Sequence, residues 1–378
     1  MKVLIVGAGI GGLALAALLK QRGIGCAIVE RAPDLRAAGY MISLYPMGSR
    51  VLHGLGSFEE FRERSAPFDD YRVLNGHGDV LHEFDMRPLS RQFGYMGTIL
   101  RSDLLEILRA AAPDVSLQYG LGLEHLEQHR SHVDVRFSDG STGTFDAVVG
   151  ADGIHSKVRR IIFGDEADHE TGWGLWVWWT KVPVPANVIQ EFWGRGRFVG
   201  IYPTPHRTGA VLAGPKSLLA PEQVGENGLR VRELFADLGG EAKQIVADFP
   251  ESTDGLFFWN LSDYRSHQWV HRRVALLGDA ACAFLPTAGV GASMALESAA
   301  VLADELTRTD SGFLPYALEM YQKRRRERVE AAQDDSRKLA VWMSAESAPL
   351  VWTRDHFLKS ASVDSLARSI SESLKQPI

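Results

Sequence analysis

The chain has 378 residues, of which 45% are hydrophobic and 23% are charged, as is typical of a soluble globular protein. At ~150 residues per domain, this length predicts about two or three domains. The 41 Lys and Arg against 47 Asp and Glu set a net charge of −6, which excludes the basic excess of a dedicated nucleic-acid-binding protein. Cys26 and Cys282 are too few for a disulfide scaffold or a cysteine zinc site, and they favour a cytoplasmic location.

Residues 3–19 are uncharged and have the look of a signal-peptide core. The segment is too short and too rich in glycine for a membrane-spanning helix. Its cleavage would remove the clearest motif of the chain, so we predict no targeting segment. No other stretch approaches ~18 apolar residues, and we therefore expect no membrane span.

A strand, a glycine-rich turn and a helix are expected at the start of the chain. Residues 2–6 form an apolar, β-rich run, residues 13–22 have a helical pattern, and residues 25–30 form a second apolar run. Together they predict a βαβ unit, the building block of parallel sheets.

The turn carries the spacing Gly7-x-Gly9-x-x-Gly12. In a dinucleotide fingerprint the first glycine permits the tight turn, the second lets a pyrophosphate approach the backbone, and the third brings the helix close to the strand. Backbone N–H groups near Gly11 would face the phosphate, and Glu30 could accept hydrogen bonds from ribose hydroxyls. We therefore predict dinucleotide binding, and the alternative is a glycine turn without a ligand.

Further elements follow up to residue 162. Helices are expected over residues 46–55, 101–111 and 156–162, and strands over residues 71–74, 80–84, 115–119, 121–126, 133–137, 142–145 and 146–151. The last run, DAVVGA, repeats the buried-strand pattern that opens the chain.

The composition changes near residue 172, where tryptophan becomes frequent. Strands are expected over residues 172–182, 191–193, 197–202, 210–213 and 256–261, and helices over residues 229–238 and 242–248. The buried-strand pattern returns at residues 273–277, and helices are expected over residues 292–306, 316–337 and the remainder to residue 378. This order predicts an α/β nucleotide-binding domain interrupted by an inserted mixed β-sheet domain.

Two later motifs indicate which dinucleotide is bound. Residues 146–159 (DAVVGADGIHSKVR) resemble the DG motif of class A flavoprotein aromatic hydroxylases, and residues 278–291 (GDAACAFLPTAGVG) resemble their GD motif. The resemblance covers roughly residues 1–340 and extends to the tetracycline-inactivating monooxygenases. It implies the para-hydroxybenzoate hydroxylase fold, with a Rossmann-like FAD-binding domain at 1–170 plus 271–310, a substrate domain at 171–270 and C-terminal helices at 311–378.

The GD segment also has a physical interpretation of its own. Asp279 follows a buried strand, at the sheet edge where α/β proteins bind ligands, and could accept hydrogen bonds from ribityl hydroxyls. The N-terminus of the helix near Ala292 would face the N1 and C2 carbonyl of a reduced, negatively charged flavin. The alternative is a capped helix after a core strand, without a ligand.

The resemblance implies further cofactor contacts. They are Arg31 at the adenosine end, Arg101, Leu123, Asp152, Pro286, Gly289, Gly291 and Ser293. Arg159 and Arg160 allow two interpretations, a phosphate-facing role or a solvated basic face.

The substrate domain is rich in aromatic residues. Strand alternation places Trp176 and Trp178 on one face and Trp179 on the other. One face of this strand should cover a cavity over the flavin. Trp176 and Trp178 therefore have two possible positions, in contact with the substrate or in the protein core. The resemblance adds Met41, Ser43, Tyr202 and Pro286 as substrate contacts. A large apolar pocket favours a hydrophobic, aromatic or polycyclic substrate.

Other chemistries lack a motif. His129 and His132 are assigned to scattered loops, with no HxxxH helix or Cys-x-x-Cys, so no metal site is predicted. No GxSxG nucleophile turn occurs, and Trp176-Val177-Trp178 is not followed by the Ile-Pro of flavin-dependent halogenases.

The resemblance therefore implies an FAD-dependent monooxygenase. NADPH or NADH, bound transiently because the chain has only one dinucleotide fingerprint, would reduce FAD, and O₂ would form a flavin C4a-hydroperoxide that delivers one oxygen atom to the substrate. No catalytic acid or base is assigned. Two alternatives stay open: a flavin-dependent dehydrogenase or reductase on the same fold, and a non-catalytic protein that binds FAD or another small molecule. Substrate identity, regiochemistry, the type of oxygen insertion and the oligomeric state do not follow from the sequence.

Overall fold

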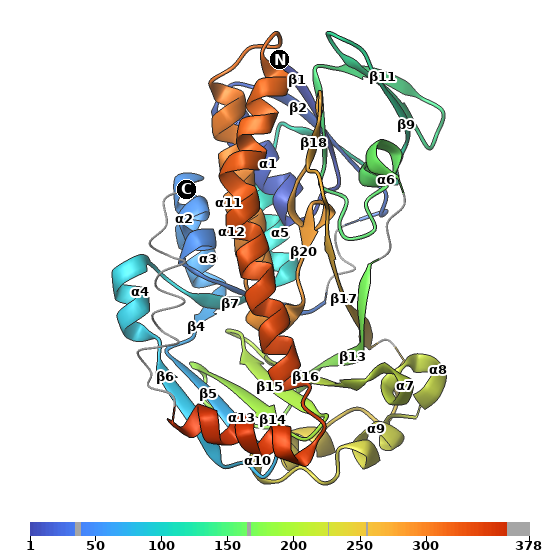
Figure 1. Ribbon diagram of the computed structural model, residues 1–378. Coiled ribbons are helices and arrows are strands. Elements are labelled where there is room, and N and C mark those ends of the chain that lie inside the picture. The colour runs from blue at the N-terminus through green and yellow to red at the C-terminus, as the bar shows by residue number, and fades with distance from the viewer. Residues whose placement is uncertain (35–38, 165–167, 226, 255, 361–378) are drawn as a thin grey trace.

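The computed structural model describes residues 1–34, 39–164, 168–225, 227–254 and 256–360. Figure 1 shows a six-stranded sheet at the N-terminal end of the molecule and an eight-stranded sheet at the opposite end. The long helix α12 (Leu314–Met343) runs beside both. The predicted α/β fold class is confirmed.

The six-stranded sheet contains the predicted βαβ unit. Its strands lie in the order β18 (Val270–His271), β19 (Val274–Leu276), β12 (Ala147–Gly150), β1 (Lys2–Val6), β2 (Gly25–Glu30) and β8 (Ser116–Tyr119). All neighbours are parallel except the pair of β18 and β19. Val3, Leu4 and Ile5 are fully buried because both faces of this sheet are covered.

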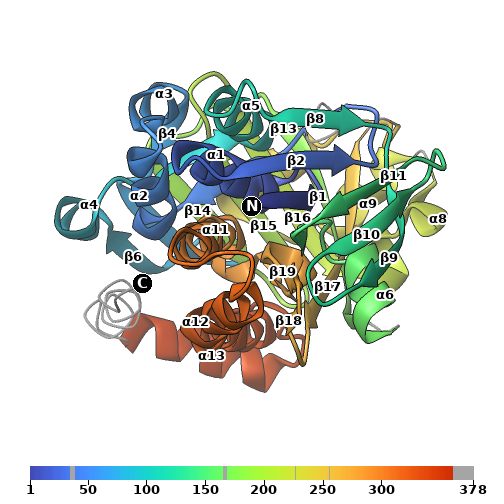
Figure 2. The same cartoon turned by 90° about the horizontal axis from the view of Figure 1, so that it is seen from above.

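Helices cover one face of the six-stranded sheet, and a small sheet lies on the other side (Figure 2). The helices are α1 (Ile10–Gln21), α5 (Arg101–Ala110) and α11 (Gly291–Thr307), and α1 packs against the other two. The small sheet has the order β11 (Thr142–Phe145), β10 (Val133–Phe137) and β9 (Leu123–Gln128), and α6 (Lys157–Phe163) packs beside it.

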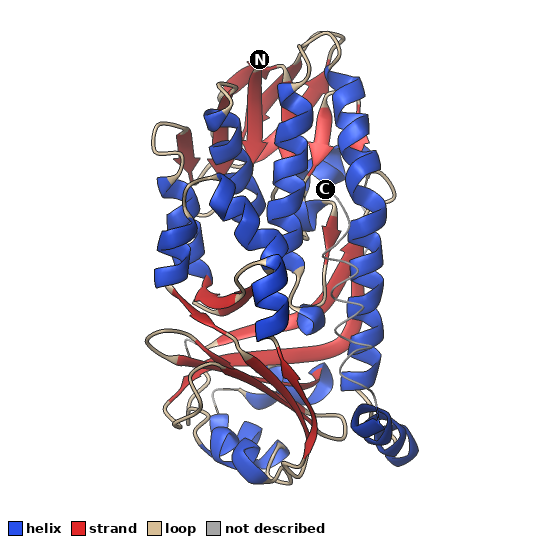
Figure 3. Ribbon diagram, turned by 90° about the vertical axis from the view of Figure 1, so that its left-hand side faces the viewer, coloured by secondary structure: helices blue, strands red, loops and turns tan. Residues whose placement is uncertain are grey.

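The eight-stranded sheet is almost entirely antiparallel. Its order is β20 (Cys282–Ala283), β17 (Phe257–Arg265), β13 (His169–Thr180), β16 (Thr208–Pro215), β15 (Phe198–Pro203), β14 (Val188–Trp193), β5 (Asp70–Asn75) and β6 (Val80–Asp85). Only β14 and β5 pair in parallel. Four short helices cover its outer face (Figure 3): α7 (Lys216–Leu219), α8 (Pro221–Val224), α9 (Gly228–Leu234) and α10 (Gly240–Ala247).

Short elements connect the two large sheets. A three-stranded sheet has the order β3 (Met41–Leu44), β7 (Gly97–Leu100) and β4 (Ser65–Pro67). The helical elements are α2 (Pro46–Gly54), α3 (Phe58–Glu63), α4 (Arg87–Phe93), the 3-10 turns η1 (Gly278–Ala280) and η2 (Pro286–Ala288), and α13 (Ala348–Ser360), which packs on β6.

The structure corrects some of the expected boundaries. Residues 70–85, which the sequence analysis assigned to the FAD-binding domain, form β5 and β6 and extend the large sheet. Helix α1 begins at Ile10 rather than at residue 13, because Gly11 and Gly12 belong to its first turn. The short elements α3, α4, β4 and β7 were not anticipated, since each is too brief to show a periodic pattern. The helix expected over residues 361–378 lies outside the described residues.

Within the described part of the chain, no helix is both long enough and apolar enough to cross a membrane.

Candidate active site

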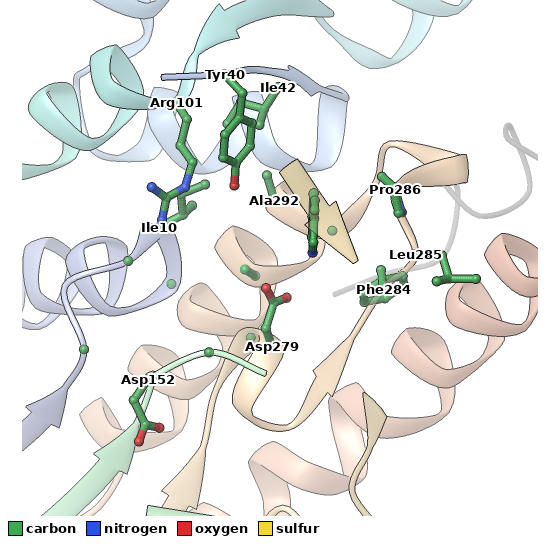
Figure 4. Close-up of a pocket in the computed structure, with 18 of the residues that line it drawn as sticks. Ile10, Tyr40, Ile42, Arg101, Asp152, Asp279, Phe284, Leu285, Pro286 and Ala292 are labelled. Atoms are coloured by element: carbon green, nitrogen blue, oxygen red, sulfur yellow. The ribbon is translucent and has the colours of Figure 1, made fainter. Parts of the chain in front are cut away.

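One large cavity of about 840 Å³ lies between the two main sheets. Figure 4 shows a part of it, with side chains converging from segments that are far apart in the sequence. Its lining begins at the β1–α1 turn, passes Asp279 and the start of α11, and reaches the inner face of the eight-stranded sheet. The size is that of a pocket for a large ligand.

The glycine-rich turn forms one end of this cavity. Gly7 has a φ of +109°, and a Cβ there would lie 2.3 Å from the carbonyl oxygen of Ala151. A Cβ on Gly9 would meet nothing within 4 Å, because this residue faces the open cavity. Gly11 also lines the cavity, whereas Gly12 packs against the backbone of Gly7. The turn therefore presents bare backbone to the space where a ligand phosphate would lie.

Glu30 lies beside the same turn, at the end of β2. Its carboxylate accepts hydrogen bonds of 2.8 Å from the backbone N–H groups of Ala8 and Ala32. These bonds fix the acid at the rim of the cavity, which it lines together with Arg31 and Leu123. Free lone pairs on its oxygens remain for ribose hydroxyls.

Asp279 occupies the centre of the cavity wall. Its carboxylate and the Arg101 side chain point into the same space in Figure 4. Burial raises the pKa of Asp279 to about 6, and the Arg101 charge opposes this rise. No protein hydrogen bond to the Asp279 carboxylate occurs among the described residues, and the side chain is exposed to the cavity, so the carboxylate is open to a hydrogen-bond donor of a ligand.

Helix α11 directs its N-terminus into the cavity. Pro286, Gly289, Gly291 and Ala292 all line it, as predicted for the GD segment. Ser293 does not: it is fully buried, and its Oγ accepts a hydrogen bond of 3.0 Å from the backbone N–H of Tyr45. The Ser293 side chain is thus engaged within the protein, and Ser293 as a cofactor contact stays a prediction.

The DG segment acts mainly through internal bonds. The Asp152 carboxylate accepts hydrogen bonds from Ser156 Oγ (2.5 Å) and from the backbone N–H groups of Lys157 (2.7 Å) and Val158 (3.1 Å). It caps α6 and points away from Asp279 (Figure 4), although Asp152 also lines the cavity. Arg159 is buried, which excludes a solvated basic face for this residue.

The tryptophan-rich strand β13 shows which face covers the cavity. Trp173, Leu175 and Val177 line the cavity, and Trp176 and Trp178 are buried on the opposite face against the short helices. Trp176 Nε1 donates a hydrogen bond of 2.9 Å to the carbonyl of Leu219 in α7. Of the two positions left open for Trp176 and Trp178, the structure shows the core position, because helices cover that face of the strand.

The other expected substrate contacts do line the cavity. Met41 and Ser43 lie on β3, and Tyr202 lies on β15. Tyr202 Oη donates a hydrogen bond of 2.8 Å to Glu191, a buried cavity residue that the sequence analysis missed. The sequence did contain a signal for Glu191, because an acidic residue inside the otherwise apolar segment VIQEFW is unusual.

His129 and His132 lie closer together than the sequence analysis assumed. With Asp134 they place one ligand atom each within 4.8 Å of one another on the β9–β10 hairpin. The His129 and His132 Nε2 atoms lie 3.2 and 3.5 Å from the Asp134 carboxylate. The hairpin turn, rather than a helical spacing, brings them together.

Comparisons with known proteins agree with this geometry. Residues 1–336 match the protein family described as FAD binding domain. A flavin-dependent monooxygenase of Legionella longbeachae is 28% identical over 91% of this chain and 89% of that protein. The 3-amino-4-hydroxybenzoate 2-monooxygenase of Streptomyces cremeus is 30% identical over 95% of this chain and 92% of that protein. The solved structure of Klebsiella pneumoniae HpxO with FAD and uric acid has a TM-score of 0.88 at 25% identity, covering 99% of this chain and 96% of that one.

Proposed function

This chain belongs to the FAD binding domain family, among flavin-dependent monooxygenases, and we propose that it uses NAD(P)H and O₂ to insert one oxygen atom into a hydrophobic, aromatic or polycyclic small molecule. The observation that carries the proposal is the continuity of the cavity. It joins the dinucleotide turn at Gly9 to Asp279 and then to the apolar strand face at Val177.

The residues of the cavity suit FAD. Gly9 leaves room for a pyrophosphate, because an added Cβ there would point into open space. Glu30 stands where the ribose hydroxyls of the adenosine half would lie. Among the described residues Asp279 has no hydrogen-bond donor of the protein, and ribityl hydroxyls would supply one.

FAD, when bound, supplies two-electron redox chemistry and the activation of O₂. The chain's own residues would bind and orient it. The first backbone N–H groups of α11, at Gly291 and Ala292, would stabilise negative charge on a flavin bound beside them. Leu175, Val177 and Val211 exclude water from the neighbouring substrate space.

The substrate class rests on the cavity wall and on relatives. Trp173, Trp259 and Tyr202 offer flat aromatic contacts beside aliphatic side chains. One relative is named for an aminohydroxybenzoate, and one similar structure holds uric acid. Planar ring compounds of this size are therefore proposed as substrates, and NADPH or NADH as a reductant without a domain of its own.

The decisive experiment measures the reduction of the flavin and the incorporation of oxygen into a product in two separate steps. The FAD-loaded protein is reduced anaerobically with NADPH or with NADH, and ¹⁸O₂ is then admitted in the presence of a panel of aromatic compounds. We expect one ¹⁸O atom in a product. Rapid reduction and substrate conversion without label would instead identify a dehydrogenase or reductase, and tight ligand binding without NAD(P)H oxidation would identify a binding protein.

A further inference from the structure

A carboxylate is buried in the part of the cavity that the large sheet lines. Glu191 lies on β14, lines the cavity, and is only 4% exposed. Among the described cavity residues of this sheet it is the only acidic one. No ion pair joins it to a Lys, Arg or His of the described chain. A buried acid without a countercharge is costly and calls for a reason.

Three side chains surround this acid, and together with Glu191 we call them the Glu191 cluster: Tyr71, Trp193 and Tyr202. Tyr202 Oη donates to Glu191 Oε1 at 2.8 Å, and Trp193 Nε1 donates to Glu191 Oε2 at 3.0 Å. Tyr71, on the neighbouring strand β5, also lowers the pKa of Glu191. The indole N–H can only donate, so Oε2 must be an acceptor.

The hydrogen bonds and the burial act on Glu191 in opposite directions. Burial raises the pKa of Glu191, while the bonds from Tyr71, Trp193 and Tyr202 hold it down. Burial and then the Glu191 charge raise the pKa of Tyr202 well above its usual range. Tyr202 therefore stays a neutral phenol, whose proton is committed to Glu191 and whose oxygen lone pairs remain available.

Trp193 and Tyr202 donate to both carboxyl oxygens of Glu191, which favours its ionised form, so the cluster presents acceptors and negative charge to the cavity and no protein donor of its own. A carboxylate offers about four lone-pair sites, and the bonds from Trp193 and Tyr202 occupy two of them. An anionic ligand group placed here would meet an uncompensated like charge in a poorly solvated site. A ligand N–H or O–H would meet two acceptors, Glu191 and Tyr202.

We propose that the Glu191 cluster is a specificity site that binds a hydroxyl or amino substituent of an aromatic substrate and rejects a carboxylate at the same position. The inference rests on the proposed function only in treating the ligand as a substrate. The binding preference itself requires no turnover.

The test compares four probes of the same shape: a naphthol, a naphthylamine, a methylnaphthalene and a naphthoate. Their Kd values are measured on the FAD-loaded protein from the perturbation of the flavin absorption spectrum. In the unaltered protein we expect naphthol and naphthylamine to bind at least about tenfold more tightly than methylnaphthalene and naphthoate, since a hydrogen bond to a charged group is worth about that much. Naphthoate binding as tight as naphthol binding would overturn the proposal without any variant.

Glu191→Gln removes the charge at nearly constant volume. We expect the ratio of naphthoate Kd to naphthol Kd to fall about tenfold, because the repulsion and the charge-assisted bond are both lost. Tyr202→Phe should weaken the binding of naphthol and leave the Kd of methylnaphthalene unchanged. Glu83→Gln, on the same sheet but exposed, is the matched control and should change no ratio.

The outcomes separate this inference from the proposed function. An unchanged ratio in a yellow, folded Glu191→Gln protein overturns the specificity site, even if ¹⁸O enters a product. A shifted ratio with no ¹⁸O in any product supports the site and refutes the monooxygenase.

Discussion

The Arg159 guanidinium donates a hydrogen bond of 3.0 Å to the carbonyl oxygen of Ala280, 121 residues further along the chain. The same group donates to the carbonyl of Ile154 at 2.6 Å and lies 3.6 Å from the centre of the Tyr264 ring. Arg159 therefore joins the DG segment to the GD segment, next to Asp279. The sequence allowed two interpretations of Arg159, a phosphate contact or a solvated surface residue. In the structure Arg159 is buried and connects the two motifs.

Arg159→Met tests this connection. The variant leaves the Ala280 and Ile154 carbonyls without their donor, at about 1–3 kcal/mol for each unsatisfied buried group. We expect the free energy of unfolding, measured by urea denaturation, to fall by about 2–4 kcal/mol. Arg22→Met, at an exposed position after α1, is the control, since a surface substitution usually changes stability by about 0.5 kcal/mol. Equal losses in the two variants would refute the structural role of Arg159.

Asp279→Ala should lose FAD. The variant removes the acceptor for the ribityl hydroxyls, and each hydrogen bond contributes about 0.5–1.5 kcal/mol, or more where a charged acceptor is lost. The ratio of flavin absorbance to protein absorbance after purification measures the loss. Asp279→Asn, which retains one acceptor oxygen, should lose less, and full yellow colour in Asp279→Ala would show that Asp279 does not hold the cofactor.

FAD affinity should depend on pH through the same residue. The pKa of Asp279 is raised to about 6, so below this pH the ligand-free protein carries a neutral acid. Ribityl donors favour the ionised form, so the affinity should be full above pH 6 and fall as the pH is lowered through it. Titration of FAD between about pH 5 and 8 measures this, and the dependence should flatten in Asp279→Asn.

The ligand-free protein should respond in the opposite direction. Because the folded-state pKa of Asp279 lies above its usual value of 3.8, this group contributes stability at low pH that is lost as the pH rises through about 6. Thermal unfolding of the FAD-free protein at several pH values, compared with Asp279→Asn, isolates the contribution. An identical pH profile in both proteins would show that Asp279 titrates normally.

Gly9→Val should block the cofactor and preserve the fold. The added side chain meets no protein atom near its Cβ, so Tm should change little, but it projects into the space reserved for the pyrophosphate. We expect flavin occupancy to be lost in a protein with unchanged far-UV circular dichroism. Normal occupancy would place the phosphates elsewhere.

The two faces of β13 can be separated by a pair of variants. Trp176→Phe lies outside the cavity and should lower stability, because it loses the hydrogen bond to Leu219 and some core volume, while aromatic ligands bind as before. Trp173→Phe lies on the cavity side and should change ligand Kd instead. A changed ligand Kd in Trp176→Phe, with an unchanged Kd in Trp173→Phe, would show that Trp176 contacts the substrate.

The cofactor end of the site could be predicted from the sequence alone. The glycine spacing at Gly7, Gly9 and Gly12 and the position of Asp279 after a buried strand are local features, and a parallel sheet brings strand ends to one edge whatever the rest of the chain does. The residues that line the substrate end of the cavity could be identified only from the tertiary structure. The alternation of side chains along a strand predicts which tryptophans share a face of β13. Which of the two faces lines the cavity depends on where helices α7–α10 pack. Glu191, Trp193 and Tyr202 come from the consecutive strands β14 and β15, but Tyr71 comes from β5, and a pairing between strands as distant in the chain as β5 and β14 leaves no local signal to read.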